Sequence, residues 1–383
     1  MVYNAAALSL KEEIFSMKFS CYKSDLTEAL QFVIRAVAVK PMTPILAGIY
    51  LKAEGSMLEL QANNFSTGII TRIPVNTEIA GEAVVSGKRF QDFVRNMPDD
   101  TITFSDENNT LSIESGGASV ELLTMPAGDF PKVKTPETDH SFRIRTTVLR
   151  DLIKRTIFAV GKDDSRPIFM GCCFEIKGDT ISLIATNTHR LALAKEKLAD
   201  TYEDCSFVVP TEALRGIMLR IDPADVENYV TIDYSMRYLT FTFDNVFVNS
   251  RLVEGQFPPY EKVIPTSSST RVKVETADFK RAVEFVSLMS KETEYNTVKF
   301  KFGDGGIEIS SNSPEVGDAG QNIEAEIDGE ELEISFNGTY IADVLRVIDS
   351  KQLDIELNDK YSPAAFTEPD NDNYVYIATP VRA

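Results

Sequence analysis

The chain has 383 residues, 43% of them hydrophobic, and a formal net charge of −19 at pH 7. This length is too great for one ordinary core and fits two or three domains. No run of about 18 apolar residues occurs, which excludes a membrane-spanning helix, and the negative charge taken alone argues against nucleic acid as a partner.

The chain begins with MVYNAAALSLKEEIFS, residues 1–16. This stretch lacks a basic start and carries Lys11, Glu12 and Glu13, so it is a poor signal peptide. We interpret it as an N-terminal extension and place the start of the first domain at Met17.

Two families of amphipathic segments predict six helices. The first family comprises residues 24–38, 146–160 and 276–290, and the second comprises 86–97, 210–221 and 337–348. Ser24, Thr146 and Thr276 are the predicted N-cap residues of the first family. Similar helices recurring at intervals of about 120 residues indicate a repeated domain.

The intervening stretches alternate apolar and polar residues and predict strands. Residues 42–64 and 165–187 correspond at an offset of 123, and each predicts two strands around a Gly-containing turn, as does 296–314. Three further predicted meanders cover residues 99–125, 228–253 and 351–380. A short motif is also duplicated, as GDFPKV at 128–133 and EGQFPPYEKV at 254–263.

These elements predict an α+β fold of three tandem domains, each with two helices packed on antiparallel sheets. The predicted boundaries are an extension at 1–16 and domains at 17–138, 139–270 and 271–383. Each copy is large enough to bury its own core, which separates this repeat from a solenoid.

Charge is distributed unevenly between the helices and the rest of the chain. The six helical segments carry a net charge of +6, so the remaining residues carry −25. The helices contain twelve notable basic residues: Arg35, Lys40, Lys88, Arg89, Arg95, Arg150, Lys154, Arg155, Arg215, Arg220, Lys280 and Arg281. These residues are either ordinary solvated charges or part of one face turned toward a polyanion. A net charge as small as +6 predicts that any contact with a polyanion is independent of its sequence.

The cysteines and histidines give no sign of a metal centre or a catalytic site. The four cysteines include the vicinal pair Cys172–Cys173 and are best read as buried thiols of a reduced compartment. The histidines, His140 and His189, lie far from any useful cysteine spacing, so no metal or cofactor is expected. By residue chemistry alone, His189 is more often structural than functional.

No nucleophile elbow, HExxH motif or phosphate-binding loop is present, so an enzyme is disfavoured. Two alternatives to contact with a polyanion remain open. One is a hydrolase that uses acidic pairs, and the other is a repeat scaffold that binds only proteins.

Several motifs, in order along residues 17–383, resemble the bacterial DNA polymerase III β subunit family, the sliding clamps. They are MKFSCYKSDLTEAL, KPMTPILAGIYL, ATNTHRLALA, EGQFPPYEKVIP, SFNGTYIADVL and YIATPVRA. The resemblance implies a non-catalytic, cytoplasmic processivity factor without cofactors. It also implies a ring-shaped head-to-tail homodimer that encircles double-stranded DNA, with the twelve basic residues facing the DNA.

The resemblance further implies a hydrophobic cleft for peptides of the polymerase III catalytic subunit, the clamp loader and other clamp-binding proteins. Its residues here would be Phe169, Thr186, Thr188, His189, Arg190, Leu191, Pro258, Lys262, Val263, Tyr340, Tyr361, Thr379, Pro380, Val381 and Arg382. The implied dimer-interface residues are Val120, Leu122, Leu288 and Met289.

The chain departs from the family pattern at several of these positions. Thr379 and Val381 stand where many members have Met, and Lys40 and Lys262 stand where they have Arg. Replacing Arg by Lys keeps the charge but loses the bidentate fork. Residues 167–168 are Pro and Ile where some members carry aromatic DNA contacts.

Overall fold

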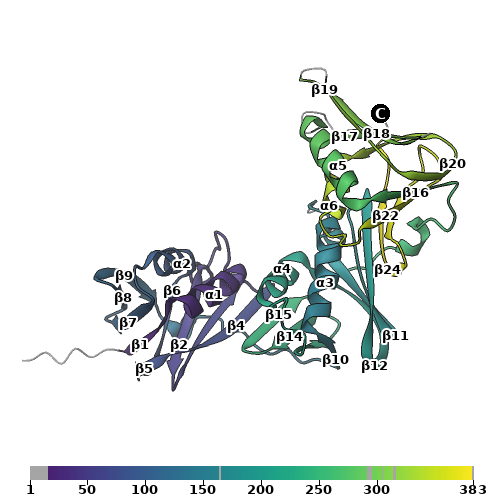
Figure 1. The fold of residues 1–383 in the computed structure, drawn as a ribbon. Coiled ribbons are helices and arrows are strands. Elements are labelled where there is room, and N and C mark those ends of the chain that lie inside the picture. The colour runs from purple at the N-terminus through teal and green to yellow at the C-terminus, as the bar shows by residue number, and fades with distance from the viewer. Residues whose placement is uncertain (1–15, 164, 291–295, 304, 314–315, 382–383) are drawn as a thin grey trace, which may run out of the picture. The chain divides into compact units, whose positions relative to one another are not determined.

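A computed structural model describes residues 16–163, 165–290, 296–303, 305–313 and 316–381 (Figure 1). The chain divides into two compact units. The first contains the described residues up to Asp139 together with Thr231–Tyr234 and Tyr238–Ser250. The second contains His140–Val230, Ser235–Arg237 and the described residues from Arg251 onward. The predicted extension at 1–16 lies outside the described residues except for Ser16.

The six predicted helices are all present, which confirms the two-helix repeat. They are α1 (Lys23–Val33), α2 (Gly87–Asn96), α3 (Thr146–Thr156), α4 (Thr211–Arg220), α5 (Thr276–Ser290) and α6 (Gly338–Val344). Short 3-10 turns continue α1 and α3, as η1 (Ile34–Ala36) and η4 (Ile157–Ala159). Within the described part of the chain, no helix is long and apolar enough to cross a membrane.

The first unit is built on antiparallel strands. They are β1 (Met17–Tyr22), β2 (Gly48–Glu54), β3 (Met57–Asn63), β4 (Thr67–Pro74), β5 (Asn76–Ile79), β6 (Gly81–Ser86), β7 (Thr101–Glu107), β8 (Thr110–Ser115), β9 (Ala118–Met125), most of β13 (Tyr229–Tyr234), β14 (Tyr238–Phe243) and β15 (Val246–Arg251). Their order is β13-β14-β15-β4-β3-β2-β6-β9-β8-β7-β1-β5. Strands β14 and β15 of the middle repeat belong to this unit because β15 pairs with β4.

The second unit contains the remaining strands. They are β10 (His140–Arg145), β11 (Gly171–Thr186), β12 (Arg190–Pro210), β16 (Thr270–Glu275), β17 (Thr297–Gly303), β18 (Gly306–Ser313), β19 (Gly317–Ile323), β20 (Glu326–Gly329), β21 (Leu332–Asn337), β22 (Gln352–Leu357), β23 (Ala364–Glu368) and β24 (Asn371–Ala378). One sheet has the order β11-β12-β24-β23-β22-β16-β20, and a second has the order β19-β18-β17-β21. The helix pairs α3–α4 and α5–α6 each lie side by side (Figure 1).

Each helix buries one stripe against the sheet beside it. In α1 the stripe includes Leu26, Leu30 and Val33, all fully buried as the 3.6-residue period predicts. Fully burying such a side chain contributes roughly 1.5–3 kcal/mol, which is why packing rather than intrinsic propensity maintains so short a helix.

The predicted turn at Gly178 is wrong. Gly55 does turn the chain between β2 and β3 with φ of 60°, as predicted. Gly178 has almost the same φ, 61°, yet β11 continues through it. The long strand β12 pairs with both halves of β11, so the irregular residues form a bulge instead of a hairpin.

The predicted N-caps are also wrong, because strand β1 and strand β10 run directly into their helices. Helix α1 begins at Lys23, which places Ser24 inside the helix. Thr146 lies inside α3 and donates its hydroxyl to the Asp225 carbonyl oxygen at 2.8 Å. A side-chain cap occurs instead at α6, where Asn337 Oδ1 accepts the backbone N–H of Thr339 at 2.9 Å.

Replacing Asn337 with Ala should lower the free energy of unfolding by about 1 kcal/mol, because the first turn of α6 loses its acceptor. Ser24→Ala is the matched control and should change it by less than about 0.5 kcal/mol. Urea unfolding of both variants measures the difference, and equal losses would contradict this assignment of the caps.

Candidate partner pocket and basic helices

A pocket of about 670 Å³ opens in the second unit where β11, β12 and α6 meet. Five of the predicted cleft residues line it: Phe169, Thr188, His189, Arg190 and Tyr340. Eight other lining residues were not predicted: Val160, Gly161, Lys162, Asp163, Arg166, Asn187, Thr339 and Asp343. Half of these, Gly161, Lys162, Asp163 and Arg166, belong to the GKDDSRP loop, whose composition is typical of a connection and carries no binding motif.

A tight turn between β11 and β12 presents one wall of the pocket. Asn187 Oδ1 accepts the backbone N–H groups of His189 and Arg190, each at 3.0 Å. Thr188 is held at a φ of 77°, and it and His189 are exposed at the pocket rim. The Asn side chain thus fixes a backbone shape that a Thr at positive φ would otherwise resist.

Arg190 forms the floor of the pocket and is only 6% exposed. Its Nη1 lies 2.8 Å from Asp343 Oδ2 of α6, and its guanidinium stands 4.4 Å from the centre of the Tyr340 ring. It also donates to the carbonyl oxygen of Phe158. The guanidinium is therefore committed to joining the middle and last repeats, and the exposed groups around it are left to meet a ligand.

The end of the described chain runs beside the same turn. The Thr379 N–H and hydroxyl both donate to the His189 carbonyl oxygen, at 3.0 and 2.8 Å. The Val381 N–H donates to the Ser335 carbonyl oxygen at 2.8 Å. Thr379, Pro380 and Val381 are half-buried, and the predicted cleft residue Arg382 lies outside the described residues.

The remaining predicted cleft residues do not line this pocket. Thr186 and Leu191 are buried beneath it, and Leu191 packs in the core with Ile184 and Ile377. Pro258 lines a different pocket of about 730 Å³. Three others are exposed elsewhere on this unit: Lys262, Val263 and Tyr361.

The two copies of the duplicated motif, GDFPKV and EGQFPPYEKV, each pack a Phe ring against another aromatic ring of the same unit. Phe257 meets the ring of Phe169 edge-on at 6.3 Å, which forms a wall beside the pocket. In the first unit Phe130 stacks on Tyr50 at 5.5 Å and packs against Ile45. The repetition therefore serves the fold, since it pins the segment that leaves each domain.

The predicted basic residues differ in exposure. Six are exposed: Lys40, Lys88, Arg89, Arg95, Arg215 and Arg281. Five are partly buried: Arg35, Arg150, Lys154, Arg220 and Lys280. Arg281 also forms an ion pair with Asp278 of its own helix.

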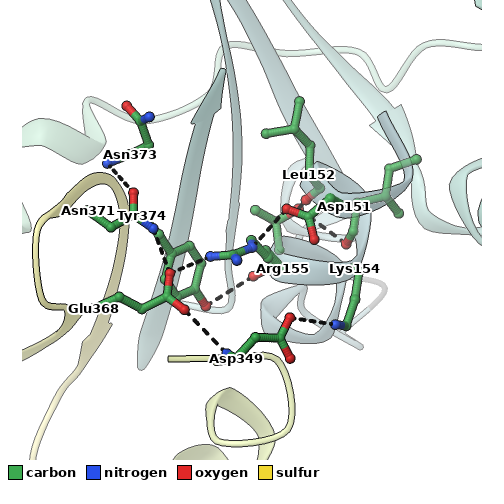
Figure 2. A network of polar contacts seen from close by, with 11 residues as sticks. Asp151, Leu152, Lys154, Arg155, Asp349, Glu368, Asn371, Asn373 and Tyr374 are labelled. Atoms are coloured by element: carbon green, nitrogen blue, oxygen red, sulfur yellow. Dashed lines mark hydrogen bonds and ion pairs between the residues drawn. The ribbon is translucent and has the colours of Figure 1, made fainter. Parts of the chain in front are cut away.

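Arg155, predicted to face DNA, has its charge paired within the protein. Its Nη1 lies 2.7 Å from Glu368 Oε2, its Nε lies 2.8 Å from Asp151 Oδ2, and its side chain is 16% exposed (Figure 2). The guanidinium stands over the Tyr374 ring at 5.3 Å. The helical pattern placed Arg155 on a predicted helix as a basic residue. It gave no sign that Glu368 of the last repeat would form an ion pair with it.

Glu368 accepts hydrogen bonds from three directions. Besides Arg155, it accepts from Asn371 Nδ2 at 2.6 Å and from the Asp349 N–H at 3.3 Å. Burial opposes ionisation, but the hydrogen bond and charge of Arg155 outweigh it, so the pKa of Glu368 lies below its ordinary value.

The predicted dimer-interface residues occupy a strand and a helix end. Val120 and Leu122 lie on β9, where Leu122 is buried and the neighbouring Leu123 is 82% exposed. Leu288 is 65% exposed and Met289 is half-buried near the end of α5. Their contact with a second copy stays a prediction.

The cysteines behave as buried thiols. Cys21, Cys172 and Cys173 are buried and Cys205 is partly buried, and none of these four described residues forms a disulfide. Burial raises the pKa of Cys172 to about 12, so this thiol stays protonated and unreactive at neutral pH.

Three family models match consecutive parts of the chain. They are described as the N-terminal, central and C-terminal domains of the DNA polymerase III beta subunit, and they match residues 17–134, 143–259 and 261–382. A beta sliding clamp from Bacillus subtilis is 33% identical over 379 residues, which is 96% of this chain and all of the relative. One from Vibrio cholerae is 28% identical with the same coverage.

Solved structures agree with these relatives. The DNA polymerase III beta subunit of Thermotoga maritima superposes with a TM-score of 0.88 at 27% identity, and the sliding clamp of Bacillus subtilis does so with 0.88 at 31%. A Pseudomonas aeruginosa sliding clamp, solved bound to griselimycin, gives 0.88 at 29%. Each comparison covers 96% of this chain and 100% of the other.

A tripled α+β domain that matches these models over its whole length defines the class of DNA sliding clamps. The chain belongs to the DNA polymerase III beta subunit family, that of the bacterial beta sliding clamps. It is a non-catalytic processivity factor, and DNA and a DNA polymerase are the partners that this family implies.

Glu368 should make the stability of the protein sensitive to acid. Because its folded pKa is lowered, its ionised form stabilises the fold above the unfolded pKa of about 4.3, and this stabilisation is lost as pH falls through the folded value. Wild type should therefore lose stability more steeply than Glu368→Gln between about pH 5 and about pH 3.

Urea unfolding across this pH range measures the two slopes. Glu284→Gln, at an exposed position of α5, is the control and should keep the wild-type slope. Parallel curves for wild type and Glu368→Gln would contradict the ionised state assigned to Glu368.

Proposed function

We propose that two copies of this chain close head to tail into a ring around double-stranded DNA and hold the replicative polymerase through the pocket. The observation that carries the proposal is the way the repeats join within the chain. At each junction a strand of one repeat extends the sheet of the next. In the part of the chain that the structure describes, the first and last repeats each present one of the two complementary edges, β9 and β19, with one side unpaired.

The two internal junctions follow one rule. Strand β4 of the first repeat pairs with β15, the last strand of the second repeat. Strand β12 of the second repeat pairs with β24, the last strand of the third. In both cases the strand that follows the first two strand segments of one repeat, β2 and β3 or the two halves of β11, meets the final strand of the next.

The same rule singles out β9 and β19 for contact between copies. Among the described residues, 118–123 of β9 pair with β8 alone, and β19 pairs with β18 alone. Pairing β19 of one copy with β9 of the next would continue the pattern, and two such contacts close a dimer in which neither of these two edges is left unpaired.

Apolar side chains beside these two edges support the same contact. We assign it Val120, Leu122, Leu288 and Met289, and add two exposed neighbours. Leu123 on β9 is 82% exposed and Phe285 on α5 is 52% exposed. Exposed apolar groups beside a free strand edge favour a protein partner over solvent.

We assign the DNA contact to the basic residues of the helices, without Arg155. The remaining eleven residues offer scattered positive charge, which suits sequence-independent contact with phosphates. A closed ring needs no tighter binding than this, because DNA is retained by linkage. The acidic remainder of the chain repels DNA from other surfaces.

We assign the pocket to docking segments of the polymerase III catalytic subunit, the clamp loader and other clamp-binding proteins. It combines the aromatic rings of Phe169 and Tyr340 with polar groups at the rim, a mixture suited to an extended, partly apolar peptide. Griselimycin, the ligand of the Pseudomonas aeruginosa clamp, is a proposed ligand of this pocket. Tethering raises the effective concentration of the polymerase at the primer end.

The domains proposed for this assembly are residues 17–138, 139–270 and 271–383, after an extension at 1–16. Its proposed compartment is the cytoplasm, where replication proceeds and thiols stay reduced.

Leu288→Asp should break the dimer, because it places a charge in the apolar contact between copies. Light scattering should change from about 85 kDa, twice the 42.6 kDa chain, to the monomer value. Leu219→Asp, on α4, is the matched control, since Leu219 is 63% exposed and Leu288 65%. A dimer that tolerates Leu288→Asp but not Leu219→Asp would place the interface elsewhere.

Protein loaded by its clamp loader onto nicked circular DNA should remain bound in high salt, and it should be lost when the circle is cut. Linkage predicts this difference because a ring can leave only over a DNA end. Gel filtration of the DNA before and after cutting measures it. Equal retention on circular and linear DNA would refute encirclement.

A further inference from the structure

We infer that Arg155 and Glu368 are positioning residues for the partner pocket. Their buried ion pair fixes the last repeat against the middle repeat, and the two walls of the pocket come from these two repeats. The inference rests on the proposed function in one respect, namely that this pocket receives the partner.

The pocket is a composite of two repeats. Arg190 and His189 come from the β11–β12 turn of the middle repeat, whereas Tyr340 and Asp343 come from α6 of the last one. A small rotation of α6 would change the spacing of these walls. Whatever fixes the angle between the repeats therefore sets the shape offered to a ligand.

Strand pairing alone leaves that angle incompletely fixed. The strands join the repeats through five residue pairs between β12 and β24, and Arg190 with Asp343 joins them at the pocket itself. Adjacent strands in a sheet vary in twist from roughly −10° to −35°, so a junction of this kind tolerates several angles. A further contact between the two repeats, away from the paired strands, would restrict the junction to one of these angles.

The ion pair of Arg155 and Glu368 provides this further contact. Figure 2 shows Arg155 of α3 reaching Glu368, which ends β23, while Lys154 reaches Asp349 on the chain between α6 and β22. Glu368 is 6% exposed, and its three donors approach from different segments. A buried carboxylate with fixed donors tolerates little displacement, whereas apolar surfaces can slide.

Covalent and hydrogen-bonded links connect the ion pair to the pocket. Phe158, three residues beyond Arg155, accepts a hydrogen bond from the Arg190 guanidinium. On the other side, Tyr374 donates its hydroxyl to the Arg155 carbonyl oxygen at 3.2 Å, and Tyr376 on the same strand donates to the Tyr340 carbonyl oxygen at 2.9 Å.

The first two repeats show that the fold does not require charge at these places. At the 123-residue offset between them, Phe32 of α1 stands where Arg155 stands in α3. Phe243 ends β14 just before a tight turn, as Glu368 ends β23. Phe32 and Phe243 are both 4% exposed, so buried apolar side chains can occupy both positions. The charged pair is found at the junction that carries the pocket.

The test uses the full chain with Arg155→Met and Glu368→Leu combined, because a single substitution would leave one buried charge without its partner. Replacing a buried ion pair by apolar residues of similar volume often leaves stability unchanged or raised. The control is Lys299→Met with Glu333→Leu, an exposed cross-strand pair of the last repeat. The readouts are the melting temperature, hydrogen exchange at residues 187–191 and 339–343, and griselimycin affinity by calorimetry.

We expect the double variant to melt at or above the wild-type temperature and yet bind griselimycin about tenfold more weakly, within the usual range of coupling between sites. Its amides at 187–191 and 339–343 should exchange faster, and the control should match wild type throughout. If the amides of both segments exchanged in the double variant at the wild-type rate, the inference would be overturned, whether or not griselimycin binds. Failure of wild type to bind griselimycin would count against the proposed pocket ligand, and the exchange measurement would still decide the role of the ion pair.

Discussion

The structure depends on the extension of one repeat's sheet by the last strand of the next repeat. Five residue pairs make this connection between β4 and β15, and five more make it between β12 and β24. Backbone hydrogen bonds do not depend on side-chain identity, so the two junctions share this pairing although the paired residues differ. The same rule leaves β9 and β19 as complementary edges, which is how a linear triplication can generate a closed assembly.

Side chains then give each junction its own properties. The Asn187 turn that shapes the pocket has a counterpart at Asn64, whose Oδ1 accepts the N–H groups of Ser66 and Thr67 at 3.0 and 2.8 Å. In the second unit this turn is followed by the buried Arg190, which binds Asp343 and creates a polar floor. The same backbone turn thus carries different side chains in the two repeats, and those of the second repeat line the pocket.

Much of this architecture could be predicted from the sequence, because it depends on local periodicity. The six helices, the alternating meanders and the turn at Gly55 follow from patterns within about 15 residues. Gly178 was predicted wrongly because a bulge and a turn need the same backbone conformation, and only the length of the partner strand distinguishes them. The ion pair of Arg155 went unpredicted for a similar reason, since its partner Glu368 lies 213 residues away and no periodic pattern connects them. The cleft residues came from a resemblance, and pocket residues such as Lys162 and Arg166 went unnoticed because loops carry little pattern.

The most direct test is electron cryo-microscopy of the purified protein assembled on a short DNA duplex. The account predicts two chains that enclose the duplex, with β9 of each chain hydrogen-bonded to β19 of the other and the basic helices lining the opening. A single chain beside the DNA, or two chains joined through other surfaces with no central opening, would contradict it.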